Sequence, residues 1–89
     1  MFNEVYDYAY ISTGATTQVK TGAGKLHSIV VGETAAGSIQ IIDGTAGTTT
    51  NLGELKASIV EGEYLFDVAF SAGLRIVTAA ASKITVVYK

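Results

Sequence analysis

The sequence predicts an all-β fold: a small antiparallel β-sandwich, jelly-roll or immunoglobulin-like, of seven or eight short strands. Ten glycines and no prolines divide the 89 residues at fairly even intervals. Short runs rich in Val, Ile, Tyr, Phe and Thr lie between the glycines, and strands with turn signals about 8–12 residues apart are typical of sandwiches and barrels. No segment has the periodicity of a long amphipathic helix.

The clearest strand is YLFDVAF, residues 64–70. Because side chains alternate between the two faces of a strand, its aromatic and valine side chains share one face, opposite Leu65, Asp67 and Ala69. The same alternation occurs in KITVVYK, SIQIID and LRIVT. We assign to the core the apolar side chains that this alternation turns inward: Phe66, Val68, Phe70, Ile41, Ile76 and Val86.

The remaining strands and turns are assigned from composition. LHSIVV (26–31) is apolar on both faces and is expected in the middle of a sheet, whereas ATTQVK (15–20) and residues 52–59 are weaker strand candidates. ELKASIVEG (54–62) is assigned to a strand. Turns are expected where glycine makes positive φ accessible: Asp43-Gly44, Glu61-Gly62-Glu63 and Ser71-Ala72-Gly73.

The first dozen residues differ in character, and we divide the chain into an N-terminal strand or arm (1–12) and one sandwich domain (13–89). In EVYDYAYIS, Tyr6, Tyr8 and Tyr10 share one face of the predicted strand. Their rings either cover a sheet of the same molecule or belong to an arm that pairs with a neighbouring subunit's sheet edge. Tyrosine suits such contacts, because it joins a large apolar area to a polar hydroxyl. These three residues are the candidate partner contacts.

Charged residues are sparse, at 16% of the chain where globular domains average about 25%. Few charges lower the desolvation cost of docking one copy on another, so we expect a subunit of an assembly; a plain soluble monomer with a Thr-rich face is the alternative. A net charge of −2 and six scattered basic residues give no electrostatic footprint for nucleic acid. With no cysteine, no signal peptide and no membrane-length apolar run, we expect one soluble domain made in the cytoplasm.

KTGAGKLHS, residues 20–28, is the stretch most similar to a phosphate-binding loop. A Walker A loop needs a glycine five positions before the Gly-Lys pair and a Ser or Thr directly after the lysine. Val19 and Leu26 occupy these two positions, and LHSIVV predicts a strand where the motif needs a helix. We therefore interpret Gly22-Ala23-Gly24 as a hairpin turn between TTQVK and KLHSIVV.

No catalytic residue, metal ligand or cofactor site is expected. His27 is the only histidine, and we expect its ring to hydrogen-bond to backbone. No nucleophile elbow is present, although spacing alone leaves several conceivable triad partners for it. Zinc would need more histidine or cysteine ligands than the chain offers. The triad candidates are Ser28, Ser38 and Ser71 with Asp43 or Asp67; calcium would need Glu61, Glu63, Asp43 and Asp67 to converge.

Taken together, TGAGKLHSIVV, IIDGT, FDVAF, GLRIVTAAA and ITVVYK resemble a group of small structural proteins of tailed bacteriophages and prophages. The resemblance runs from about Thr21 to Tyr88 and leaves out the N-terminal dozen residues. It implies a virion protein assembled in the host cytoplasm, most plausibly a head decoration or cement protein that binds the major capsid protein or another virion protein. It implies no catalytic residue.

From this resemblance we expect a non-enzymatic homo-oligomer, with a trimer as the first guess by analogy with decoration proteins. Deleting residues 1–12 is then expected to leave a folded domain that no longer assembles. The alternative from another class is a tail- or fibre-associated module that binds a glycan or receptor. Such modules present aromatic platforms, and the N-terminal tyrosines are the aromatic residues that the strand pattern does not assign to the core.

Overall fold

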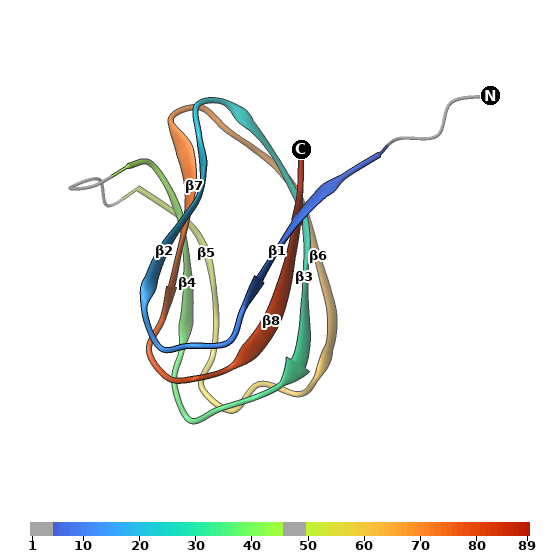
Figure 1. Cartoon of the computed structure of the whole chain (residues 1–89), viewed down its shortest axis with the longest axis vertical. Coiled ribbons are helices and arrows are strands. Elements are labelled where there is room, and N and C mark those ends of the chain that lie inside the picture. Colours follow the sequence, from blue (N-terminus) through green and yellow to red (C-terminus); the bar gives the residue numbers. More distant parts are fainter. Residues whose placement is uncertain (1–4, 46–49) are drawn as a thin grey trace.

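The computed structural model describes residues 5–45 and 50–89, and within them the chain forms eight β-strands (Figure 1). The described residues include no helix long and apolar enough to cross a membrane. The prediction of an all-β fold is confirmed. The strands are β1 (Asp7–Ile11), β2 (Thr16–Thr21), β3 (Gly24–Glu33), β4 (Ile39–Asp43), β5 (Thr50–Leu55), β6 (Gly62–Phe70), β7 (Gly73–Thr78) and β8 (Lys83–Tyr88).

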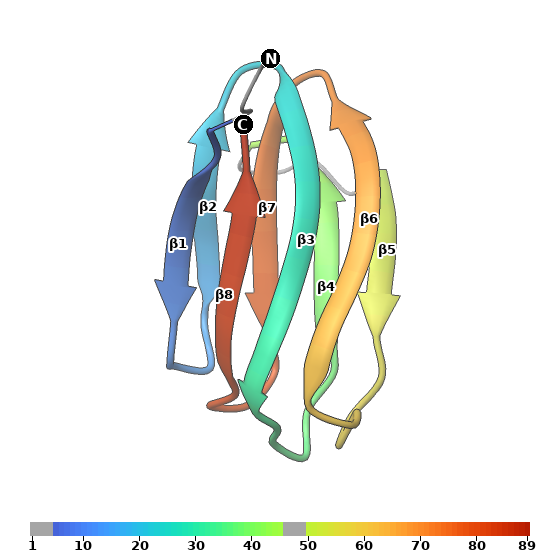
Figure 2. The ribbon, with the colours of Figure 1, turned by 90° about the vertical axis from the view of Figure 1, so that its right-hand side faces the viewer.

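The strands form two antiparallel sheets of four. Sheet A has the order β1-β8-β3-β6 and sheet B the order β2-β7-β4-β5. Figure 2 looks onto sheet A, with sheet B behind it. The chain is paired with itself from its ends to its middle: β1 with β8, β2 with β7, β3 with β6 and β4 with β5. A double ribbon wound in this way over two sheets is a jelly roll, so it is the jelly roll that forms rather than the immunoglobulin-like arrangement.

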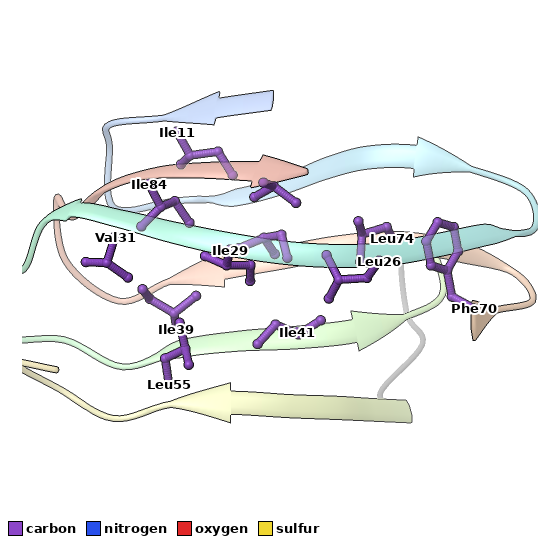
Figure 3. Packing of buried hydrophobic residues seen from close by; sticks show 12 residues of the cluster. Ile11, Leu26, Ile29, Val31, Ile39, Ile41, Leu55, Phe70, Leu74 and Ile84 are labelled. Carbon is purple, nitrogen blue, oxygen red and sulfur yellow. The ribbon is translucent and has the colours of Figure 1, made fainter. Parts of the chain in front are cut away.

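The core lies between the sheets and is built from alternate apolar side chains of the strands (Figure 3). Ile41 of β4 and Ile76 of β7 are cross-strand partners, and both are fully buried. Val86 and Phe70 are also buried, as predicted. The other residues assigned to the core, on β6, are partly buried and pack against its margin, because β6 is an edge strand: Phe66 and Val68.

The segment 54–62 is not the continuous strand that its composition predicts. β5 ends at Leu55, and residues 56–61 form a loop. Ser58 has a φ of 55°, which interrupts an extended strand, and its N–H donates to the carbonyl of Ala35 at 2.9 Å. The loop carries the chain from sheet B to sheet A, since β5 and β6 belong to different sheets.

Residues 22–24 form the predicted turn, but the turn does not close a hairpin. β2 lies in sheet B and β3 in sheet A, so the two strands that it joins do not pair with each other. Gly22 has a φ of 93°, a conformation open mainly to glycine. A Cβ on Gly24 would collide with the carbonyl oxygen of Lys89 and lie 2.7 Å from the ring of Phe70. Gly22 thus supplies the positive φ of this corner between the sheets, and Gly24 allows its close packing.

Three of the four edge strands in the described part of the chain contain a β-bulge. Gln18 and Lys20 of β2 pair with adjacent residues of β7, so one extra residue lies between them. The extra residue on β5 lies within 51–53, and the one on β6 lies within 65–68. In each case the extra residue belongs to the edge strand and not to its inner neighbour, which twists that edge locally.

The N-terminal strand β1 is the fourth edge, and its register is regular. It pairs with β8 without a shift from Asp7, opposite Tyr88, to Ile11, opposite Ile84. Ile11 is buried in the core, and Ala9 packs against it. In this chain, residues 7–11 therefore complete sheet A of their own molecule. Residues 1–4 of the predicted arm lie outside the described residues.

Candidate functional site

The outer face of sheet A, which points away from the core, combines exposed apolar side chains with two ion pairs, Lys25–Asp67 and Lys83–Glu33. Ile84 and Val86 of β8 are buried, so Thr85 and Val87 between them point outward. One cross-strand row joins outward side chains of all four strands: Tyr10, Thr85, Val30 and Glu63. A second contact on this face pairs Tyr8 with Val87.

The exposed apolar side chains on this face lie at its two edges. Tyr8 is 73% exposed and Tyr10 is 59% exposed, both on β1. Leu65, on the opposite edge strand β6, is 63% exposed. The two tyrosines share the outer face, as the sequence pattern predicts, whereas Ala9 faces the core. Large side chains with this exposure are candidates for contact with another molecule.

The outer face of sheet B differs, because no exposed large apolar side chain of the described residues lies on its strands. Ile39 and Ile41 of β4 are buried, so Gln40 points outward, and its cross-strand partner is Glu54. The next strand of this sheet places Arg75 on the same face. Of the two faces, sheet A is therefore the better candidate for a docking surface.

Tyr6, the third predicted contact, is half-buried, and its ring stacks on His27 with centroids 4.4 Å apart. His27 Nδ1 lies 2.7 Å from Asp67 Oδ1, and Lys25 Nζ lies 3.9 Å from the same oxygen. Asp67 reaches this position with a φ of 48° within the β6 bulge. The ring of His27 is therefore held by a carboxylate and an aromatic ring, and the predicted hydrogen bond to backbone is wrong.

The His27–Asp67 pair matches two members of a catalytic triad, but no serine completes it among the described residues. Ser28, the next residue, is fully buried, and its hydroxyl has no hydrogen-bond partner among the described residues, so it does not bond to His27. Ser71 Oγ donates to Asp43 and not to His27. The pair thus joins β3 to β6 across the bulge and orients the ring on which Tyr6 stacks.

Asp43 in the IIDGT segment stabilises the turn between β6 and β7. Its carboxylate accepts hydrogen bonds from the backbone N–H groups of Ser71 and Ala72 at 2.9 Å each and of Gly73 at 3.4 Å. These bonds, that from Ser71 foremost, hold the pKa of Asp43 below its ordinary value of 3.8. The four acids considered for calcium do not converge: within residues 5–45 and 50–89, no three His, Cys, Asp or Glu side chains gather as a metal site.

The glycine-rich turn is not arranged as a phosphate site. A phosphate loop presents free backbone N–H groups to the anion. Here Gly22 N–H donates to the carbonyl of Ala72 at 2.9 Å, and Lys25 N–H donates to that of Lys89 at 2.9 Å. Both donors are used within the fold, so neither is free to bind an anion.

Comparison with known proteins supports the fold and little beyond it. No family model matches the chain, and no curated protein matches it significantly. A crystal structure of the Drosophila NLP core, reported for its insight into pentamer formation and histone binding, is similar over 97% of both chains, with a TM-score of 0.59 and 12% sequence identity. The similarity is one of architecture.

The sequence pattern predicts the outward direction of Leu65, which is confirmed, but does not name Leu65 as a candidate contact. Val60 is 72% exposed and lies in the loop 56–61, which the sequence analysis assigns to a strand. The pairing of His27 with Asp67 gave no sequence signal, because the two residues lie 40 positions apart.

Proposed function

We propose that this chain is a non-enzymatic structural protein of a tailed-phage particle, a head decoration or cement protein. In this proposal the outer face of sheet A binds the major capsid protein, and the chain reaches the virion during assembly in the host cytoplasm. The observation that carries the proposal is the exposure of Tyr8, Tyr10 and Leu65 on the outer face of one sheet. The sequence resemblance described above supplies the virion context.

Several features support an adhesive role. Exposed tyrosines contribute a large apolar area together with a hydroxyl that can hydrogen-bond at an interface. The opposite face of the sandwich carries Arg75, Gln40 and Glu54, and no exposed large apolar side chain of the described residues lies on its strands. A subunit that exposes large apolar side chains on one face is suited to lie on a protein lattice with its other face in water.

We also propose that the chain acts as a homo-oligomer. The NLP core, which has the same architecture, is described in connection with pentamer formation. The resemblance to phage decoration proteins suggested three copies. The similar structure and the sequence resemblance both favour self-association of this chain, but they differ in the number of copies. That number depends on how the subunits contact each other.

Co-sedimentation tests the capsid proposal. Wild-type protein is mixed with heads of the phage whose genome encodes it, and heads of an unrelated phage serve as the control. Leu65→Lys places a charge on the proposed docking face and is expected to reduce binding at least about tenfold. Val60→Lys is the matched control, because Val60 is also largely exposed but lies in the β5–β6 loop. Equal binding to both kinds of head, or to neither, would refute the proposal.

A glycan- or receptor-binding module on a tail or fibre is the second candidate, and the exposed Tyr8 and Tyr10 pair favours it. Two neighbouring aromatic side chains on one sheet face can stack on sugar rings. A glycan array with wild-type protein and a Tyr8→Ser/Tyr10→Ser variant separates the two functions. Specific sugar binding that the variant loses would favour this candidate over the capsid role.

A further inference from the structure

β1 is the one edge strand in the described residues that lacks the usual protection of a sheet edge. It ends the order of sheet A and pairs only with β8. An edge strand presents unpaired N–H and C=O groups along its free side, which can pair with a strand of another chain. Natural proteins block such edges with bulges, lysine, proline or inward charges.

The other three edges carry such protection. β2 has a bulge with Lys20 beside it, β5 has a bulge that includes Gly53, and β6 has a bulge in which Asp67 adopts positive φ. β1, by contrast, has a regular register, and its sequence DYAYI contains neither lysine nor proline. Its one charged residue, Asp7, lies at the end of the strand.

We propose that the free edge of β1 pairs antiparallel with β1 of a second copy of this chain. Pairing with a bulged edge would interrupt the hydrogen-bond ladder, so the regular edge is best matched by itself. A contact of a surface with itself is two-fold symmetric and closes as a dimer. This pairing joins two copies of sheet A into one continuous sheet. It also extends the proposed docking face, and only this second consequence rests on the proposed function.

The side chains of β1 suit a two-fold axis that passes near Ala9. Tyr8 then lies opposite Tyr10 of the second copy, and Tyr10 opposite its Tyr8, all on the outer face. Cross-strand aromatic pairs stabilise antiparallel sheets. Asp7 lies opposite Ile11 of the second copy, so the two acids do not face each other. This register brings the most exposed aromatic residues of the described chain into contact.

The contact is small, since β1 has five residues. Stable complexes bury about 800 Å² per partner, and a five-residue strand pair falls well below that area. The free dimer is therefore expected to be weak, with a dissociation constant of roughly 10 μM to 1 mM. Copies held side by side on a lattice would pair more readily, because docking raises their effective concentration.

Disulfide trapping tests the pairing directly, because the chain has no cysteine. Tyr8→Cys and Tyr10→Cys variants, one with a tag that distinguishes its mass, are mixed at about 0.5 mM, near the expected dissociation constant, and oxidised without any capsid. Directly opposed residues lie about 4.5–5.5 Å apart between Cα atoms, within disulfide range. The mixed disulfide is expected to predominate over either homodimer. Predominance of one homodimer would still indicate pairing through β1, but with the two-fold axis near Tyr8 or Tyr10 instead of Ala9.

Leu65→Cys is the matched control, because it has similar exposure on the opposite, bulged edge of sheet A. It is expected to cross-link slowly and without preference. Cross-linking of Leu65→Cys as fast as the β1 variants would overturn the proposal, as would the absence of β1 disulfides. Because no capsid is present, this outcome is independent of the co-sedimentation result.

Sedimentation equilibrium gives a second measurement. Tyr10→Lys places like charges near each other across the proposed axis and is expected to raise the dimer dissociation constant at least about tenfold. Val60→Lys, in the β5–β6 loop, is expected to leave it unchanged. Circular dichroism checks that both variants fold. A wild-type trimer or pentamer that persists in Tyr10→Lys would contradict the β1 pairing.

Discussion

The ring of Tyr6 stacks on the imidazole of His27, with the ring centroids 4.4 Å apart and the planes inclined by 16°. Tyr6 directly precedes the edge strand β1, whereas His27 lies on β3, and β8 separates the two strands. His27 is held in turn by Asp67 of β6. These contacts connect the start of β1 to the far edge of sheet A across its outer face.

A double-mutant cycle between Tyr6→Ala and His27→Ala measures this stack. We expect a coupling free energy of about 0.5–1 kcal/mol in urea unfolding, because stacked aromatic pairs contribute that much beyond buried area. A cycle between Tyr8→Ala and His27→Ala is the control and should give coupling near zero, since Tyr8 is 73% exposed. Equal coupling in both cycles would mean that the stack has no specific effect.

The hydrogen bonds to Asp43 predict a pH dependence of stability. The pKa of Asp43 in the folded chain lies below its ordinary value of 3.8, so the folded state favours the ionised carboxylate. This contribution is complete above the unfolded pKa and is lost as pH falls through the folded pKa. Asp43→Asn is therefore expected to unfold more easily than wild type at about pH 7, and the difference should shrink below about pH 3.8.

The measurement for Asp43 is urea unfolding of both proteins across this pH range. Glu54→Gln, on the outer face of sheet B, controls for the loss of one surface charge. If Asp43→Asn and wild type differ by the same free energy at every pH, the carboxylate charge does not stabilise the turn.

Strand positions with strict alternation could be predicted from the sequence. Burial along β6 alternates from Tyr64 to Phe70 as the pattern indicates, because an edge strand of a sandwich has one face on the core. Composition, without strict alternation, gave the wrong prediction for residues 54–62. A loop with Ser58 at positive φ also places occasional apolar side chains, such as Ile59, against the core.

Contacts between strands could not be predicted, because they depend on topology and register. The outward direction of Tyr8 and Tyr10 follows from local alternation and was predicted. The partner of His27 depends on which strand lies beside β3 and on the bulge that turns Asp67 toward it. Which of the four edge strands contain a bulge is known only from the strand register, since a bulge is an extra residue relative to the neighbouring strand.

Two buried hydroxyl groups differ in their hydrogen bonding, so replacing each residue with alanine should change the stability of the fold differently. Ser28 Oγ has no hydrogen-bond partner among the described residues, whereas Thr78 Oγ1 donates toward the carbonyls of Thr13 and Ala15 at 2.6 and 3.0 Å. Ser28→Ala is expected to be neutral or stabilising by up to about 1 kcal/mol, and Thr78→Ala to destabilise by about 1–3 kcal/mol. Thermal unfolding checks both. A large loss in Ser28→Ala would indicate that its hydroxyl is satisfied.

Truncation of either of the paired core isoleucines should strongly lower the free energy of unfolding. Ile41→Ala and Ile76→Ala are each expected to cost about 2–5 kcal/mol, because both side chains are fully buried. As cross-strand partners they share one cavity, so the double variant should depart from the sum of the single variants. Urea unfolding of the three variants tests this, with Leu65→Ala, on the exposed face of β6, as the control.

The location of Ile11 changes the expected result of removing the N-terminal segment. Deletion of residues 1–12 was expected to leave a folded domain, but Ile11 is only 5% exposed, and β1 covers one edge of β8. Loss of this side chain alone should cost about 2–5 kcal/mol, a large part of the stability of a small domain. We therefore expect the truncated chain to be largely unfolded by circular dichroism, whereas Tyr8→Ser/Tyr10→Ser should keep wild-type stability within about 1 kcal/mol and lose association. A folded truncated chain would instead show that residues 13–89 form an independent domain and that β1 is a detachable arm.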